Sequence, residues 1–182
     1  AGRSSFPIPS RAYWVGLAWG RIPPRELDPS LFRPPRREGE RFPFRDKPAG
    51  GLWLSLWVEG YGPEWGIPWL LECGSLPGDP ALGLRSPVWE VDLRGLRLEV
   101  ASRTPPDWER LFLEKDGLVV PYHALREAFP YAHLAWWRLY DVDTVWLAVW
   151  PGEERLRRLG TLGEVVPERA LRELEERYRK DL

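Results

Sequence analysis

The segment from Lys47 to Trp57 constrains the fold more than any other part of the chain. It reads KPAGGLWLSLW, so a proline and two glycines lead directly into a run of large apolar residues. The paired glycines permit a close approach of the backbone to its neighbours that a side chain would prevent. Side chains alternate along a strand, so Trp53, Ser55 and Trp57 share one face. That face is either the wall of a pocket or the outer side of an amphipathic edge strand.

The composition indicates a protein adapted to high temperature. Arginine outnumbers lysine 23 to 3, proline occurs 20 times, and asparagine, glutamine and methionine are absent. Few thermolabile side chains and proline-rich loops are typical of thermophiles. An arginine excess also follows from a GC-rich genome. We therefore expect the source to be a thermophilic bacterium or its phage.

Charge and cysteine content exclude several classes of protein. A net charge of −1 gives no reason to expect a nucleic acid or an acidic protein as the partner. The single cysteine, Cys73, excludes an intramolecular disulfide and a cysteine-based zinc site, and we expect no structural metal. No apolar run is long enough to span a membrane, and the N-terminus lacks the apolar core of a signal peptide. These features predict a cytoplasmic protein with no membrane partner.

The patterning predicts a single domain over residues 1–182, of the α+β class. We expect a mostly antiparallel, twisted sheet with short helices and a C-terminal helix. Residues 1–10 are expected to form a loose arm, and residues 20–47 a long loop, because their prolines and arginines disfavour regular structure. The closing helix is expected over 167–182, where Pro167 opens an apolar stripe.

Apolar runs mark the expected strands, at 13–19, 51–58, 88–93, 96–101, 118–120, 135–140 and 144–150. The last two are expected to pair as a hairpin, and one continuous, bulged strand is the alternative for 88–101. A short helix is expected over 64–73, with Trp65 and Trp69 on one face. Another helix is expected to follow Thr104, which would cap it.

The expected hairpin turn carries the main candidates for metal chemistry. Asp141 and Asp143 are two residues apart and can face the same way on an extended chain, and paired carboxylates of this kind hold Mg²⁺ or Ca²⁺ in nucleases and polymerases. Aspartate is equally common in turns, because it tolerates turn geometry. A nuclease site needs a further carboxylate, and nothing in the spacing supplies it. The two histidines, His123 and His133, do not have the spacing of a zinc motif.

Four blocks of the chain, taken in order, resemble a family of uncharacterised bacterial and phage proteins. The blocks are Lys-Pro-x-Gly-Leu-Trp-x-Ser, Trp-x-x-x-Cys, Asp-Gly-hydrophobic-Pro-Tyr and a late tryptophan-rich segment, here at Lys47–Ser55, Trp69–Cys73, Asp116–Tyr122 and Trp136–Trp146. Their order is kept over residues 42–150. An extra glycine before Leu52 and the compact spacing after Asp141 depart from the pattern.

The same arrangement is similar, as a remote relative, to the ADP-ribosyltransferase fold. That fold carries an arginine or histidine with an aromatic residue on a first strand, an aromatic-x-serine on a second, and an acid on a later strand. The resemblance implies NAD as the cofactor, bound by Arg11, Tyr13, Trp53 and Tyr122. It implies a catalytic group of Ser55, Asp141 and Asp143.

In such a site Ser55 would hold the nicotinamide ribose, and Tyr13 or Trp53 would stack on the nicotinamide ring. The late acid would stabilise the oxocarbenium-like state as nicotinamide leaves. These transferases use glutamate there, so an aspartate departs from the family. The sequence does not identify a partner. A protein and a nucleic acid are the two candidate substrates of such a transferase.

Three functions follow from these observations. The first is an ADP-ribosyltransferase-like domain that binds NAD. The alternative is a non-enzymatic binding or structural module, such as a phage accessory protein, in which the 12 tryptophans form a core and an interaction patch. The third is a metal-dependent nuclease.

Overall fold

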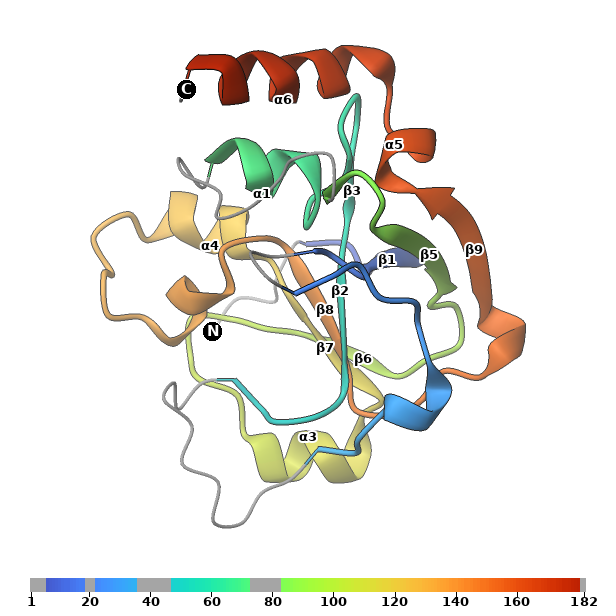
Figure 1. Ribbon diagram of the computed structural model, residues 1–182. Helices are drawn as coiled ribbons and strands as arrows, with labels where there is room; N and C mark the ends of the chain where they lie inside the picture. Colours follow the sequence, from blue (N-terminus) through green and yellow to red (C-terminus); the bar gives the residue numbers. More distant parts are fainter. Residues whose placement is uncertain (1–5, 19–21, 36–46, 73–82, 181–182) are drawn as a thin grey trace.

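The computed structural model describes residues 6–18, 22–35, 47–72 and 83–180 (Figure 1). A seven-stranded sheet runs through them in the order β6-β7-β8-β2-β1-β5-β9. Its strands are β1 (Arg11–Val15), β2 (Leu52–Ser55), β5 (Pro87–Asp92), β6 (Leu98–Val100), β7 (Gly117–Val120), β8 (Thr144–Leu147) and β9 (Leu156–Thr161). Every pair is antiparallel except β6 with β7. A separate pair joins β3 (Trp57–Val58) to β4 (Gly62–Pro63).

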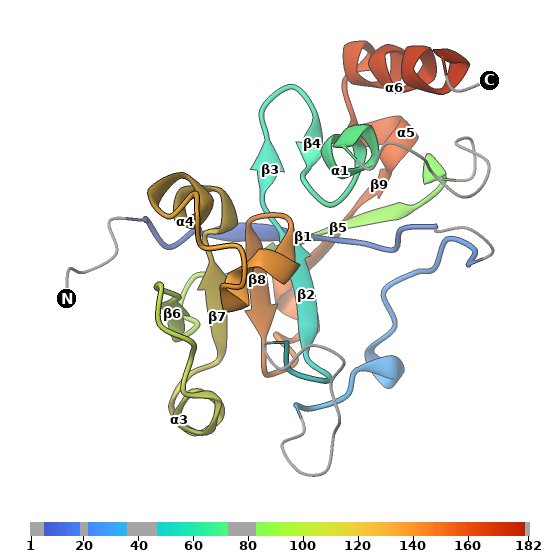
Figure 2. The same ribbon diagram turned by 90° about the vertical axis from the view of Figure 1, so that its left-hand side faces the viewer.

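The helices are short apart from the last. They are α1 (Ile67–Glu72), α3 (Trp108–Glu114), α4 (Tyr122–Ala128), α5 (Leu162–Val165) and α6 (Glu168–Lys180), with 3-10 turns η1 (Pro29–Leu31), η2 (Trp136–Tyr140) and η3 (Glu153–Arg155). Helices α1, α5 and α6 gather at one end of the molecule and α3 at the other (Figures 1 and 2). The α+β class with a mostly antiparallel sheet is therefore confirmed. Within the described ranges, no helix combines the length and apolar character that crossing a bilayer requires.

The sheet is not flat, as the connection between β5 and β6 shows. Strands β5 and β6 lie near opposite ends of the strand order, although only residues 93–97 join them. An extended chain spans at most about 21 Å over that distance, whereas five strand spacings amount to about 24 Å. The two ends must therefore approach each other, and Leu93 and Leu98 share one buried cluster. The interpretation of 88–101 as two strands is confirmed, and the alternative of one continuous strand is wrong.

The two glycines before β2 are required by a close contact. Gly50 and Gly51 have φ angles of 72° and 76°, which glycine adopts without strain. A Cβ on Gly51 would lie 2.2 Å from Nε1 of Trp146 and 2.6 Å from the carbonyl oxygen of Leu147. The same indole N–H donates to the Gly50 carbonyl at 3.1 Å. The predicted close approach of this backbone is confirmed, and its neighbour is β8.

The prediction of a strand over 135–140 is wrong, and so is the predicted hairpin between this segment and 144–150. This segment is the 3-10 turn η2, and Trp136, Trp137 and Tyr140 are all buried. Asp141 then adopts a left-handed φ of 64° and redirects the chain toward β8. An apolar run of this length does not distinguish a strand from a buried helical turn. The turn role expected for aspartate holds for Asp141, at the end of η2.

Two further boundaries differ from expectation. Helix α3 is capped by Asp107, whose carboxylate accepts a hydrogen bond from the Arg110 N–H at 3.2 Å, and not by Thr104. Strand β1 begins at Arg11, two residues before the expected start, and ends at Val15. The sequence pattern does not predict strand β9, because the exposed Arg157 and Arg158 interrupt its apolar residues.

The described part of the long 20–47 loop is fastened to the sheet. The carboxylate of Glu26 accepts a hydrogen bond from Nε1 of Trp89 at 2.8 Å and pairs with Arg158 at 3.1 Å. Phe32 packs against Trp150 with ring centres 5.7 Å apart. Residues 36–46 of this loop, and residues 1–5 of the expected N-terminal arm, lie outside the described part.

Candidate functional site

Strands β1 and β2 line an aromatic cavity of about 310 Å³. Tyr13 and Ser55 are opposite each other on these antiparallel strands and so lie on the same face. Trp53, two residues from Ser55, shares that face. Trp65 and Trp69, with ring centres 6.4 Å apart, also line the cavity from α1 and the turn before it. With Trp14, five aromatic side chains line the cavity, and Tyr13 and Ser55 are the two of its described lining residues that carry a hydroxyl.

Ser55 is fully buried and already holds part of the site together. Its hydroxyl oxygen accepts a hydrogen bond from the Trp65 N–H at 3.0 Å. Strand β2 lies between β8 and β1, so the alternative of an edge strand is wrong. Trp57, the third residue of the predicted face, is 40% exposed on β3, and its ring centre lies 5.0 Å from that of Tyr13. The structure favours the pocket-wall interpretation for Trp53 and Ser55.

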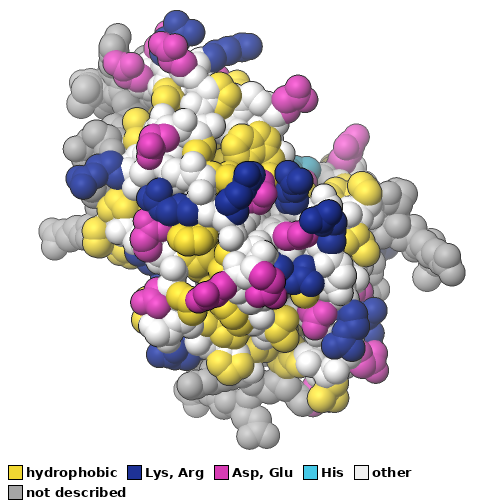
Figure 3. Space-filling view, turned by 90° about the vertical axis from the view of Figure 1, so that its right-hand side faces the viewer, with side chains coloured by type: hydrophobic (Ala, Val, Ile, Leu, Met, Phe, Trp, Pro, Cys, Tyr) yellow, Lys and Arg dark blue, Asp and Glu magenta, His cyan; other side chains and the backbone are white. Residues whose placement is uncertain are grey.

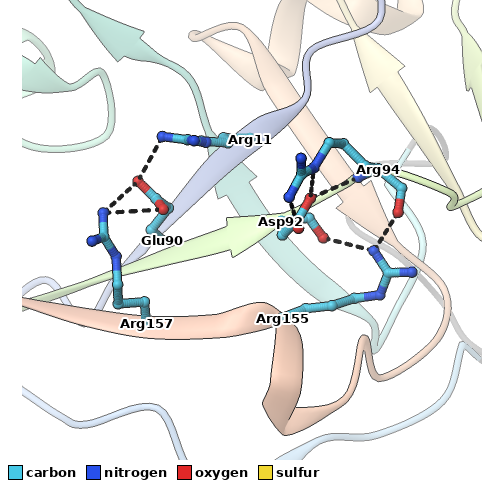
Figure 4. A network of polar contacts seen from close by, with 6 residues as sticks. All are labelled: Arg11, Glu90, Asp92, Arg94, Arg155 and Arg157. Carbon is cyan, nitrogen blue, oxygen red and sulfur yellow. Dashed lines mark hydrogen bonds and ion pairs between the residues drawn. The ribbon is translucent and has the colours of Figure 1, made fainter.

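Arg11 belongs to a surface ion-pair network (Figure 4) and is not among the residues that line the cavity. Its guanidinium lies 3.8 Å from the Glu90 carboxylate, which also pairs with Arg157 at 3.3 Å. The Tyr13 hydroxyl donates to the same carboxylate at 3.5 Å. Burial, and then the charge of Glu90, raise the pKa of Tyr13 above its ordinary value.

A second part of this network closes the turn between β5 and β6. Arg94 binds the Asp92 carboxylate at 2.8 Å, and Arg155 donates to the Asp92 carbonyl at 3.1 Å (Figure 4). The hydrogen bonds from Arg94 hold the pKa of Asp92 well below its usual range. Basic and acidic side chains are interspersed over this face (Figure 3). These arginines therefore have acidic or carbonyl partners of their own.

Arg25 is the basic residue among those described that line the cavity, and sequence reasoning did not single it out. It is exposed, lines the cavity, and lies over the Trp14 ring, 5.6 Å from the ring centre. Its place depends on the path of the 20–47 loop, which no local pattern predicts. The pair Trp65 and Trp69 did carry a signal, the spacing of four residues, although α1 begins only at Ile67.

Asp141 and Tyr122 are not among the residues that line the cavity. Asp141 is exposed and raises the pKa of Lys47, which burial lowers by a larger amount. The Lys47 ammonium lies 5.1 Å from the ring centre of Tyr140 and 6.0 Å from that of Trp53. Tyr122 is 7% exposed in a core cluster, with its ring 6.2 Å from that of Trp137. Core packing accounts for Tyr122.

Asp143 lies in a different polar group, with Glu64 and His123. Its carboxylate accepts a hydrogen bond from the His123 N–H at 3.0 Å, and its own N–H donates to Glu64 at 2.8 Å. Burial is the main cause that raises the pKa of Asp143. Asp141 is not part of this group, so the two aspartates do not form the pair that the nuclease hypothesis requires. Glu64 gave no signal in the sequence.

Comparisons of the chain with models of protein families, with curated proteins and with solved structures find no match. Of the residues implied by the resemblance, Tyr13, Trp53 and Ser55 meet in one cavity. Arg11, Tyr122, Asp141 and Asp143 lie elsewhere.

Proposed function

We propose that the protein binds NAD, with the nicotinamide end of the dinucleotide in the aromatic cavity. The observation that carries this proposal is the meeting of Tyr13, Trp53 and Ser55 on neighbouring strands, as the resemblance to ADP-ribosyltransferases requires. The later strand of that scheme, β8, is also adjacent to β2. The three strands expected to carry the site are thus consecutive in the sheet.

The dimensions of the cavity suit one ring system with its ribose. A volume of about 310 Å³ is at the small end of the range for ligand pockets. Stacking of a base on an aromatic side chain stabilises a complex by about 1–3 kcal/mol. The exposed guanidinium of Arg25 suits a phosphate oxygen at the cavity edge, because it offers paired N–H donors. The adenosine half of the dinucleotide would extend beyond the cavity.

The proposal is for binding and does not include efficient ADP-ribosyl transfer. Transfer requires an acid near the ribose to stabilise the developing positive charge. None of the described residues that line the cavity is acidic. Thr144 of β8 is the residue opposite Ser55, and its hydroxyl donates to the Val142 carbonyl at 2.8 Å. Asp143 directs its carboxylate to His123.

Calorimetric titration of the full chain with NAD, nicotinamide mononucleotide and ADP-ribose tests the proposal. Trp69→Leu should weaken NAD binding by about 5- to 150-fold, the equivalent of one lost stacking contact. The matched control is Trp108→Leu, which alters a half-buried helical tryptophan in another cluster. Absence of NAD binding by the wild type, or equal weakening by both substitutions, contradicts the proposal.

A nicotinamide-release assay separates binding from catalysis. We expect saturable NAD binding with no release above the rate without protein. Release that disappears in Asp143→Asn would instead support the transferase hypothesis with an aspartate as its acid. Absence of both binding and release would favour the non-enzymatic, tryptophan-rich module.

A further inference from the structure

Three side chains from distant parts of the chain converge beside α4. Glu64 comes from the turn between β4 and α1, His123 from the first turn of α4, and Asp143 from the residue before β8. One potential ligand atom from each lies within 4.8 Å of the other two. The imidazole Nε2 of His123 directly contacts Oε2 of Glu64.

Backbone hydrogen bonds position both carboxylates. Oε1 of Glu64 accepts from the Asp143 N–H at 2.8 Å, and Oδ1 of Asp143 accepts from the His123 N–H at 3.0 Å. Each carboxylate is thus held by the backbone of another member of the group, and the backbone of Tyr122 also hydrogen-bonds to Asp143. Outer hydrogen bonds of this kind orient metal ligands in proteins. Glu64 is buried, with its side chain 11% exposed, so its orientation is further fixed by packing.

The group has no arginine or lysine partner in the described part of the chain, and the ion pair that Glu64 forms is with the imidazole of His123 itself. Among the described residues, neither Glu64 nor Asp143 forms an ion pair with an arginine or a lysine. A metal ion that binds the imidazole displaces any proton there, and the group then offers the ion one neutral nitrogen and two carboxylates, of which that of Glu64 is buried. Buried charges require compensation, and a divalent cation supplies it in full.

We propose that Glu64, His123 and Asp143 bind one divalent transition-metal ion, Zn²⁺ or Mn²⁺. Imidazole favours transition metals, whereas Mg²⁺ and Ca²⁺ prefer sites made of oxygen alone. Three protein ligands leave at least one coordination position of the ion open. Catalytic zinc sites have this arrangement, whereas structural zinc sites have four protein ligands. The His123 side chain is 43% exposed and lines an open hollow with Arg126, His133 and Arg138, which provides access for the ion and for a further ligand.

The proposed metal site does not depend on NAD binding, although residues of the metal site and of the aromatic cavity are adjacent in the sequence. Glu64 belongs to the metal group, while the N–H of the following Trp65 binds Ser55 beneath the aromatic cavity. The NAD titration uses EDTA-treated protein, and the metal titration uses metal salts alone. Failure of one proposal therefore leaves the other standing.

The test is calorimetric titration of untagged, EDTA-treated full chain with Zn²⁺ and Mn²⁺, with Mg²⁺ and Ca²⁺ as comparison ions. We expect one site per chain for the transition metals. His123→Ala should weaken binding by at least about 100-fold, beyond the 10- to 100-fold cost of losing an outer partner. The matched control is His133→Ala, which removes the other imidazole of the chain and should bind as the wild type does.

Two further measurements make the result decisive. Asp143→Asn keeps an acceptor for the His123 N–H, so it should fold normally yet bind metal more weakly. The visible spectrum of the Co²⁺-loaded protein should lose its intensity in His123→Ala. Absence of transition-metal binding by the wild type overturns the proposal, as does unchanged binding in His123→Ala. Either result would leave the group as a hydrogen-bonded link between β4 and α4.

Discussion

Substitution of Gly51 by alanine tests the contact that sets β2 beside β8. The φ angle of Gly51 is 76°, and an added Cβ would lie 2.2 Å from Nε1 of Trp146. Contacts under 3.0 Å are essentially never seen for real Cβ atoms, so the indole or the backbone must shift. The hydrogen bond from this indole to the Gly50 carbonyl is then strained or lost.

The expected cost has two parts. A left-handed conformation costs an alanine about 1–2 kcal/mol. Overpacking of a well-filled interior adds about 1–3 kcal/mol. Gly51→Ala should therefore lower the free energy of unfolding by about 2–5 kcal/mol, a large fraction of the roughly 5–15 kcal/mol typical of a domain.

Gly60→Ala is the matched control. Gly60 has a φ angle of 82°, and an added Cβ there meets nothing within 4 Å. It should lose only the conformational part, about 1–2 kcal/mol. Urea unfolding followed by circular dichroism measures both variants. Equal losses in Gly51→Ala and Gly60→Ala would refute the reasoning, because the contact with Trp146 would then contribute nothing.

Three further predictions concern single side chains. Asp107→Ala should destabilise the protein by about 0.5–2 kcal/mol through loss of the α3 cap, whereas Thr104→Ala should stay within about 0.5 kcal/mol by chemical denaturation. Ser55→Ala should cost about 1–3 kcal/mol in the same assay, because it leaves the partly buried Trp65 N–H without its acceptor. The raised pKa of Tyr13 contributes stability that is complete below the unfolded value of about 10 and is lost as the pH rises through the folded value. In melting curves from pH 9 to 11.5, Tyr13→Phe should therefore flatten the alkaline decline, and an unchanged slope would contradict this.

Local sequence patterns predict those features that depend on a single strand or helix. The period of two along residues 52–55 placed Trp53 and Ser55 on one face, and the structure puts both in the cavity lining. The apolar stripe after Pro167 indicated the helix now seen at Glu168–Lys180. The expected antiparallel sheet followed from several short apolar runs in the same way.

Long-range packing decided the features that the sequence did not reveal. Glu64, His123 and Asp143 are 59 and 20 residues apart along the chain, and no spacing rule connects them. Arg25 reaches the cavity only through the course of the 20–47 loop. The segment 135–140 was misassigned because Trp136 and Trp137 are adjacent and both buried, a pattern that strands and helical turns share.

The central claim is that the cavity lined by Trp53, Trp65 and Trp69 holds the ring of a bound nucleotide. The most direct test is the set of indole N–H signals in a nitrogen-15 correlation spectrum, assigned by single substitutions and followed as NAD is added. The account predicts that the signals of these three tryptophans shift together and saturate, while those of Trp89 and Trp136 stay in place. No shift, or shifts confined to tryptophans outside the cavity, would contradict it.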